Sequence, residues 1–133
     1  MQARSDGRAS EEPGPILIVD DDPGIRQTLQ WALEDEGYLV STARDGRDGL
    51  HQALRQKPVL VILDAAMPVL DGQGFAAELR RHYQRSVPIV LITADGRAAE
   101  KARRVGAFGY VQKPFDIDNF IALVRQGLAM GDE

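Results

Sequence analysis

Five apolar runs alternate with five helix-forming segments along this chain, and this alternation constrains the fold more than any other feature. The first, third and fourth runs are almost entirely aliphatic, which is typical of strands covered on both faces. Because right-handed crossovers place helices on both faces of a parallel sheet, the pattern predicts a three-layer α/β sandwich. The predicted strands span Ile16–Asp20, Tyr38–Ala43, Val59–Asp64, Ile89–Thr93 and Phe108–Gln112.

The segments between the strands carry apolar residues at helical spacing. Asp22 precedes Pro23 and is predicted to cap the first helix. In the second helix we expect Leu50, Ala53 and Leu54 to face the core. The predicted helices begin near Pro23, Gly46, Gly74, Arg97 and Asp116, and the first four end near Gly37, Gln56, Tyr83 and Val105.

Length and composition are those of one ordinary globular domain. The 133 residues suffice for a single core, and no apolar stretch approaches the length that spans a bilayer. The absence of cysteine excludes disulfides and thiolate metal sites, which fits a cytoplasmic location. A net charge of -4 argues against non-specific DNA binding. We predict a flexible tail over residues 1–15 and one domain over residues 16–130, with no further domain after it.

Acidic residues stand where two of the aliphatic runs end. Asp20 and Asp21 follow the first run, and Asp64 closes the third. The second run alternates in polarity, as an edge strand does, which makes the first and third strands neighbours. Ligands of doubly wound sheets bind at the carboxyl ends of the strands, where the strand order reverses, so these three acids are expected to meet there. Their mutual repulsion calls for a divalent cation, and Mg²⁺ suits oxygen ligands best.

The residues at the strand ends resemble those of the receiver domain of two-component response regulators. The resemblance runs from about Ile16 to Met130 and implies the flavodoxin-like strand order 2-1-3-4-5. It also implies a single-domain regulator. The matching segments are Ile16–Asp22, Asp64 with Met67-Pro68 and Asp71-Gly72, Leu91–Ala94 and Gly109–Phe115.

The resemblance also implies which residues bind the metal ion. Asp21 and Asp64 are the expected direct ligands of Mg²⁺, and Asp20 is expected to act partly through water. The backbone carbonyl of Ala66 is the fourth expected contributor. Asp71 is interpreted as a turn residue with Gly72 rather than as a ligand.

The same resemblance assigns the chemistry and the switch. Asp64 is the expected nucleophile, which accepts a phosphoryl group and becomes an aspartyl phosphate. Lys113 is expected to neutralise the phosphoryl oxygens, and Thr93 to donate its hydroxyl to the new group. Tyr110 is expected to turn inward as the switch residue, and Lys113-Pro114 is expected to be a cis peptide.

The resemblance implies protein partners rather than nucleic acid or membrane. The phosphoryl donor is expected to be a phosphohistidine on a sensor kinase or histidine phosphotransfer protein. The signal is expected to leave by contact with a downstream protein, through the fourth helix, fifth strand and fifth helix. The chain is therefore interpreted as a phosphoacceptor signalling domain and not as an enzyme.

Three alternatives stand beside this interpretation. An aspartate-nucleophile phosphohydrolase typically carries a second Asp two residues after the nucleophile, but Ala66 occupies that position. A flavodoxin-like electron carrier needs a phosphate loop that the acids at Asp20–Asp22 would repel. A receiver fragment of a longer DNA-binding regulator stays open. Trp31 is predicted either to cover a neighbouring loop or to be exposed for a partner.

Overall fold

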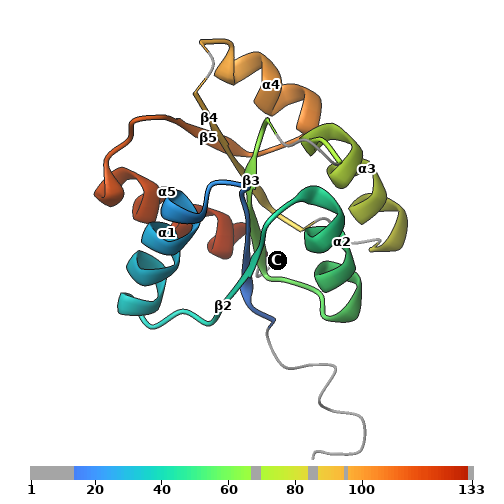
Figure 1. Ribbon diagram of the computed structural model, residues 1–133, viewed down its shortest axis with the longest axis horizontal. Helices are drawn as coiled ribbons and strands as arrows, with labels where there is room; N and C mark the ends of the chain where they lie inside the picture. The colour runs from blue at the N-terminus through green and yellow to red at the C-terminus, as the bar shows by residue number, and fades with distance from the viewer. Residues whose placement is uncertain (1–13, 67–69, 84–86, 95, 132–133) are drawn as a thin grey trace, which may run out of the picture.

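A parallel sheet with helices on both faces forms the centre of the computed structural model of this protein (Figure 1). The structure describes residues 14–66, 70–83, 87–94 and 96–131. All neighbouring strands are parallel, and their order is β2-β1-β3-β4-β5. The predicted fold class and strand order are thus confirmed. The strands are β1 (Ile16–Val19), β2 (Val40–Ala43), β3 (Leu60–Asp64), β4 (Ile89–Thr93) and β5 (Gly109–Gln112).

One helix follows each strand. Asp22 caps the first helix as predicted, because its side chain accepts hydrogen bonds from the backbone N–H groups of Gly24 and Ile25. Asp71 caps the third helix in the same way, with Gly74 as the donor. The helices are α1 (Pro23–Asp35), α2 (Gly46–Arg55), α3 (Gly72–His82), α4 (Ala98–Val105) and α5 (Ile117–Gly131).

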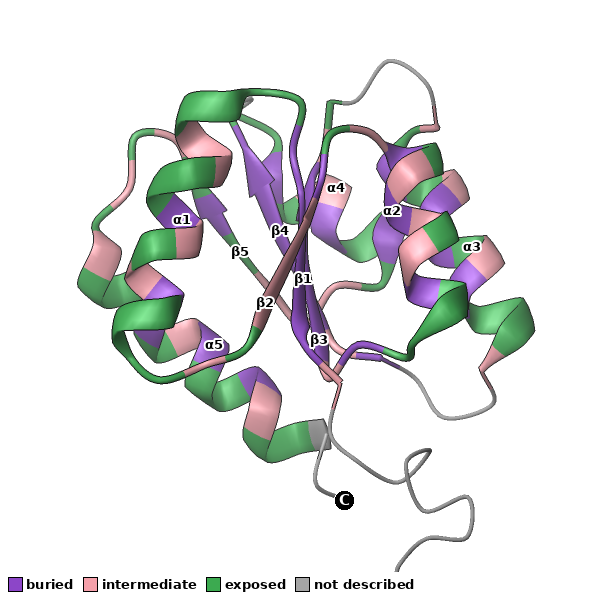
Figure 2. Ribbon diagram, turned by 60° about the horizontal axis from the view of Figure 1, so that its bottom comes forward, coloured by how far each residue is buried: buried purple, intermediate pink, exposed green. Residues whose placement is uncertain are grey.

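The two faces of the sheet bury separate hydrophobic clusters. Helices α1 and α5 cover one face, and α2, α3 and α4 cover the other (Figures 1 and 2). Successive strand residues point to opposite faces, so Ile16 and Ile18 pack towards α1 and α5 while Leu17 and Val19 pack towards the other layer. Burying each such side chain contributes about 1.5–3 kcal/mol. No helix within the described ranges has the length and hydropathy that crossing a bilayer requires.

The sheet register brings the carboxyl ends of the central strands to one edge. Val19 of β1 pairs with Leu63 of β3, and Asp64 pairs with Ile92 of β4. The residue after Val19 therefore leaves β1 beside the last residue of β3. This register positions the site described below.

Some sequence-based expectations differ from the structure. Leu54 is 38% exposed, so the prediction that it faces the core is wrong. Leu54 lies about 100° around the helix from the buried Ala53. Gly49 makes the close contact with the sheet instead, at Val19, while Gly46 packs against Leu70. Trp31 is 64% exposed on the outer side of α1.

The predicted tail over residues 1–15 and the Met67-Pro68 part of the resemblance fall largely outside the described residues. Within the described part, Pro15 is buried and its carbonyl accepts a hydrogen bond from the Val59 backbone N–H at 3.0 Å. The chain is therefore joined to the sheet one residue before β1 begins.

We expect substitution of Gly49 to destabilise the fold. A Cβ at Gly49 would lie 2.8 Å from Cγ2 of Val19 and 3.3 Å from Cε2 of Phe75, so a valine there must push α2 away from the sheet. Overpacking of this kind lowers the free energy of unfolding of Gly49→Val by about 2 kcal/mol, measurable by urea denaturation. Gly96→Val is the matched control, since nothing lies within 4 Å of that position. Equal stability of the two variants would contradict the close approach.

Candidate functional site

Three carboxylates meet at the carboxyl edge of the sheet, where β1 and β3 run side by side (Figure 1). Asp20 and Asp21 follow β1, and Asp64 is the last residue of β3. One carboxylate oxygen from each of the three lies within 4.8 Å of the others. Asp20 is fully buried and Asp64 is 4% exposed, whereas Asp21 is at the surface. The structure thus brings together the three acids that the sequence singled out.

The backbone around Asp20 is held from several sides. Its N–H donates to the carbonyl of Ala43 at 3.1 Å, and its Oδ1 accepts from the N–H of Asp22 at 2.9 Å. Its carbonyl accepts from Nη1 of Arg26 at 2.7 Å. Its Oδ2 is buried and has no hydrogen-bond partner among the described residues. Among the described residues nothing donates a hydrogen bond to that oxygen, so it is available to a ligand.

Asp64 is oriented by the turn that follows β3. The backbone N–H of Ala66 donates to Oδ1 of Asp64 at 3.2 Å, and the N–H of Ala65 donates to the carbonyl of Ile92 at 2.9 Å. The turn is therefore hydrogen-bonded to β4 as well as continuing from β3. The Asp64 carboxylate lies in the acidic cluster.

Thr93 at the end of β4 and Lys113 just after β5 reach the same edge. The N–H of Lys113 donates to the carbonyl of Thr93 at 2.8 Å, which joins the ends of the two strands. Nζ of Lys113 lies 3.8 Å from Oδ2 of Asp20. Thr93 is 3% exposed, and the Lys113-Pro114 peptide is cis, as expected.

The donor set fits a divalent cation. Three carboxylates face one ammonium group among the described residues, so the cluster keeps excess negative charge when all three acids are ionised. A buried carboxylate oxygen without a hydrogen-bond partner is costly unless a charge compensates it, and Oδ2 of Asp20 has only the Lys113 ammonium, at 3.8 Å, among the described residues. Mg²⁺ takes a few carboxylate ligands and keeps several waters, which suits a cluster with one exposed member.

Burial and mutual repulsion make the two inner acids hard to ionise. Burial, and after it the charge of Asp20, raise the pKa of Asp64 from 3.8 to about 7. Burial also raises the pKa of Asp20, while its bond from Asp22 and the charge of Lys113 act in the opposite direction. A cation bound here must therefore displace a proton near neutral pH.

This ionisation predicts how the stability of the metal-free protein depends on pH. The folded state keeps the proton on Asp64 up to about pH 7, whereas the unfolded chain releases it near 3.8, so the free energy of unfolding falls as the pH rises between these values. Asp64→Asn has no such ionisation. We expect the variant to gain about 2–4 kcal/mol over the unaltered protein between pH 4 and pH 7, measured by urea denaturation in chelator. Parallel pH profiles of the two proteins would contradict the raised pKa.

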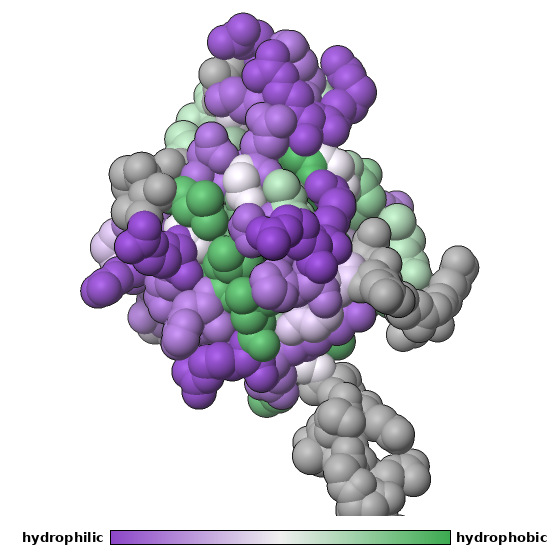
Figure 3. Space-filling model, turned by 90° about the vertical axis from the view of Figure 1, so that its right-hand side faces the viewer, coloured by the Kyte–Doolittle hydropathy of each residue, from purple (hydrophilic) through white to green (hydrophobic). Residues whose placement is uncertain are grey.

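Tyr110 and α4 form the surface beside this edge. Tyr110 lies on β5 and is 42% exposed, so its side chain is directed outward in this structure. Helix α4 has eight residues, no side-chain cap and a small buried face of Ala98, Ala102 and Val105. Hydrophilic side chains cover the part of the molecule where α4 lies (Figure 3). Few buried contacts therefore hold α4 to the sheet.

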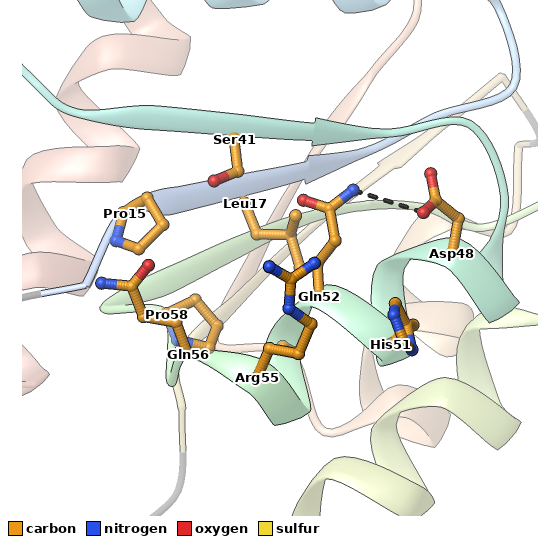
Figure 4. A pocket seen from close by; sticks show the side chains of 10 residues that line it. Pro15, Leu17, Ser41, Asp48, His51, Gln52, Arg55, Gln56 and Pro58 are labelled. Atoms are coloured by element: carbon orange, nitrogen blue, oxygen red, sulfur yellow. Dashed lines mark hydrogen bonds between the residues drawn. The ribbon is translucent and has the colours of Figure 1, made fainter. Parts of the chain in front are cut away.

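A separate hollow of about 530 Å³ lies between α2 and the first two strands (Figure 4). Ser41, Gln52 and Arg55 are among its lining residues, and Gln52 donates to the carbonyl of Thr42 at 2.8 Å and to Asp48 at 3.3 Å. None of the three acids lines this hollow, so it is not part of the acidic cluster.

One residue at the site was missed by the sequence reasoning. Arg26 contacts the backbone of Asp20, but nothing in the apolar pattern of α1 marks it. Its spacing offers a weak signal, because it stands one turn after the cap residue Asp22 and helical side chains lean towards the helix start. The sequence alone does not say which atom such a side chain reaches.

The chain resembles a described family over most of its length. The family model for the response regulator receiver domain matches residues 16–125. The chain is 39% identical over 120 residues to the probable transcriptional regulator ycf27 of Pyropia yezoensis, which covers 89% of this chain and 49% of that protein. It therefore spans about half the length of that relative.

Solved structures agree with these sequence matches. Chemotaxis protein CheY4 of Vibrio cholerae superposes with a TM-score of 0.78 at 32% identity, covering 88% of this chain and 100% of that chain. A putative response regulator from Chloroflexus aurantiacus gives a TM-score of 0.81 at 31% identity, covering 89% of this chain and 99% of that chain.

Proposed function

This chain belongs to the response regulator receiver family of two-component signalling, and we propose that Asp64 is the residue on which it accepts a phosphoryl group. Phosphorylation on aspartate is the general mechanism of the family. The observation that carries the proposal is the buried Asp64 carboxylate, within 4.8 Å of two other acids and at the end of a central strand.

Asp64 acts as the nucleophile of the transfer. One of its carboxylate oxygens attacks the phosphorus of a phosphohistidine, so that a P–O bond forms as the P–N bond breaks, and the leaving imidazole takes up a proton. Phosphoryl transfer asks the protein mainly for alignment and charge stabilisation. The hydrogen bond from the Ala66 N–H to Oδ1 of Asp64 supports that alignment.

Receiver domains generally bind Mg²⁺ at an acidic pocket. In this chain Asp21, Asp64 and the carbonyl of Ala66 are proposed as direct ligands, with Asp20 acting partly through water. The orphaned Oδ2 of Asp20 supports a role for that residue. Bound Mg²⁺ supplies positive charge against the phosphoryl oxygens.

Lys113 and Thr93 complete the proposed site. Lys113, whose Nζ is 3.8 Å from Asp20, neutralises a phosphoryl oxygen in the loaded state. The Thr93 hydroxyl donates a hydrogen bond to the new phosphoryl group. Both residues are joined through the bond between the Lys113 N–H and the Thr93 carbonyl, so a shift of one moves the other.

The proposed switch couples this edge to α4. A phosphoryl group adds close to two negative charges and three acceptor oxygens, which draws Thr93 inward and lets Tyr110 follow. Tyr110 is 42% exposed before phosphorylation. The surface that changes is the face formed by α4, β5 and α5, and a downstream protein binds to it.

Response regulators work with histidine kinases and downstream effectors. We propose a sensor kinase or a histidine phosphotransfer protein as the donor here, and an output by protein contact without direct nucleic-acid or membrane binding. The domain is a phosphoacceptor that assists its own phosphorylation and dephosphorylation, not an enzyme with a turned-over substrate. A cytoplasmic location remains a prediction.

The test uses a small acyl phosphate as the donor. Incubation with acetyl phosphate and Mg²⁺ should attach one phosphoryl group that hydroxylamine removes, and peptide mapping should find it on Asp64. Phosphate mapped to another residue would overturn the assignment. Sustained hydrolysis of phosphate esters would instead favour the phosphohydrolase alternative.

A further inference from the structure

We propose that Arg26 is a positioning residue for the cation site, which it serves by holding the backbone of the Asp20–Asp21 segment. The inference rests on the proposed function, because it concerns the same acids. It goes beyond that function in naming a side chain on α1, outside the acidic cluster, that sets the affinity for the ion.

The hydrogen bonds of Asp20 support this role. Its N–H, its Oδ1 and its carbonyl each have one partner, and the partner of the carbonyl is Nη1 of Arg26 at 2.7 Å. Asp20 is fully buried, so its carbonyl has no water to replace a lost donor. Without Arg26 the segment must either leave a buried acceptor unsatisfied or shift towards solvent.

The position of Arg26 makes the bond a bridge between strand and helix. Arg26 lies in the first turn of α1, and its own N–H donates to the carbonyl of Asp22 at 3.0 Å. Asp22 in turn caps α1 through Gly24 and Ile25. The Asp22 cap joins the end of the Asp20–Asp22 turn to α1, and the Arg26 guanidinium joins its beginning to the same helix through the Asp20 carbonyl. Both ends of the turn are therefore bonded to α1.

The bond also places a positive charge beside the acids without occupying the site. The guanidinium carries a positive charge, and here it binds a carbonyl rather than a carboxylate. Oδ2 of Asp20 therefore has no hydrogen-bond partner among the described residues, with Nζ of Lys113 at 3.8 Å, and is available to a cation. Arg26 and Lys113 reach different atoms of Asp20, the carbonyl and Oδ2.

Mg²⁺ titration of Arg26→Met tests the proposal. Methionine keeps much of the aliphatic stem but cannot donate to the carbonyl. Loss of a partner behind metal ligands typically weakens affinity 10–100-fold, and we expect Kd for Mg²⁺ to rise about tenfold by calorimetry. The Mg²⁺-induced rise in the unfolding midpoint should shrink in parallel, which gives a readout independent of phosphorylation.

Two further variants separate position from charge. Arg55→Met is the matched control, since it removes the same charge at the far end of α2 and should leave Kd unchanged. Arg26→Lys keeps a donor and should recover most of the lost affinity. The difference between Arg26→Met and the unaltered protein should persist in high salt, where the effect of distant charges is screened.

The inference fails if folded Arg26→Met binds Mg²⁺ as tightly as the unaltered protein. It also fails if Arg55→Met loses as much affinity, or if Arg26→Lys recovers none of it. Absence of Mg²⁺ binding in the unaltered protein would be a different result, because it contradicts the proposed cation site itself.

Discussion

Asp64→Asn should abolish phosphoryl incorporation. Asparagine keeps the volume and one oxygen of the side chain, but an amide is a very weak nucleophile. Loss of the attacking group in covalent catalysis typically costs several orders of magnitude, so we expect incorporation from acetyl phosphate to fall at least 1000-fold, roughly to background. Labelled phosphate bound after a fixed time is the measurement. Because asparagine also removes a buried charge, the variant should stay folded.

Asp71→Asn is the matched control for that loss. Asp71 is an exposed acid near the same edge, but its side chain caps α3 through the Gly74 N–H, and asparagine caps equally well. The control should therefore accept phosphate at the rate of the unaltered protein. Retained incorporation in Asp64→Asn would show that another residue is the acceptor. A comparable loss in Asp71→Asn would show that incorporation responds to any acid at this edge.

Removal of Mg²⁺ should have the second largest effect. Without the ion, burial and the charge of Asp20 raise the pKa of Asp64 to about 7, so the nucleophile is partly neutral at neutral pH. The incoming phosphoryl oxygens would also meet uncompensated carboxylates. We expect chelation to slow incorporation at least 100-fold, roughly the loss of several kcal/mol of charge stabilisation.

The pH dependence of Mg²⁺ binding provides a sharper form of this test. Below about pH 7 the ion competes with the proton on Asp64, so Kd for Mg²⁺ should increase by up to about tenfold for each unit by which the pH is lowered. Above pH 7, Kd should no longer depend on pH. Calorimetry in buffers of different ionisation enthalpy should detect about half a proton released at pH 7 and about one at pH 6. Restoring Mg²⁺ should restore incorporation, whereas NaCl of equal ionic strength should not. Undiminished incorporation in chelator would contradict the proposed role of the ion.

Much of the fold was predictable because buried strands leave a strong local signal. Runs such as Ile16–Val19 and Leu60–Leu63 have no polar residue to place in solvent, so they must lie between layers. The capping role of Asp22 follows from its position before Pro23. Boundaries differed by one or two residues where the chain leaves the sheet, as at Asp20.

The details that failed depend on how elements pack. Leu54 has the hydropathy of a core residue, but α2 approaches the sheet through Gly49, and that approach leaves Leu54 on an exposed side of the helix. Arg26 has the pattern of a solvated helix residue, but the turn before α1 brings a buried carbonyl within its reach. Neither outcome is encoded in a short window of sequence.

The sequence by itself determined the alternation of strands and helices and the acids that end two strands, because hydropathy and side-chain chemistry are local properties. Only the tertiary structure decided that Asp20 is fully buried while Asp21 is exposed, that Oδ2 of Asp20 lacks a hydrogen-bond partner among the described residues, and that the pKa of Asp64 is raised to about 7. Burial, desolvation and hydrogen-bond partnership are properties of the surroundings of an atom. Those surroundings here come from four strands that are far apart along the chain.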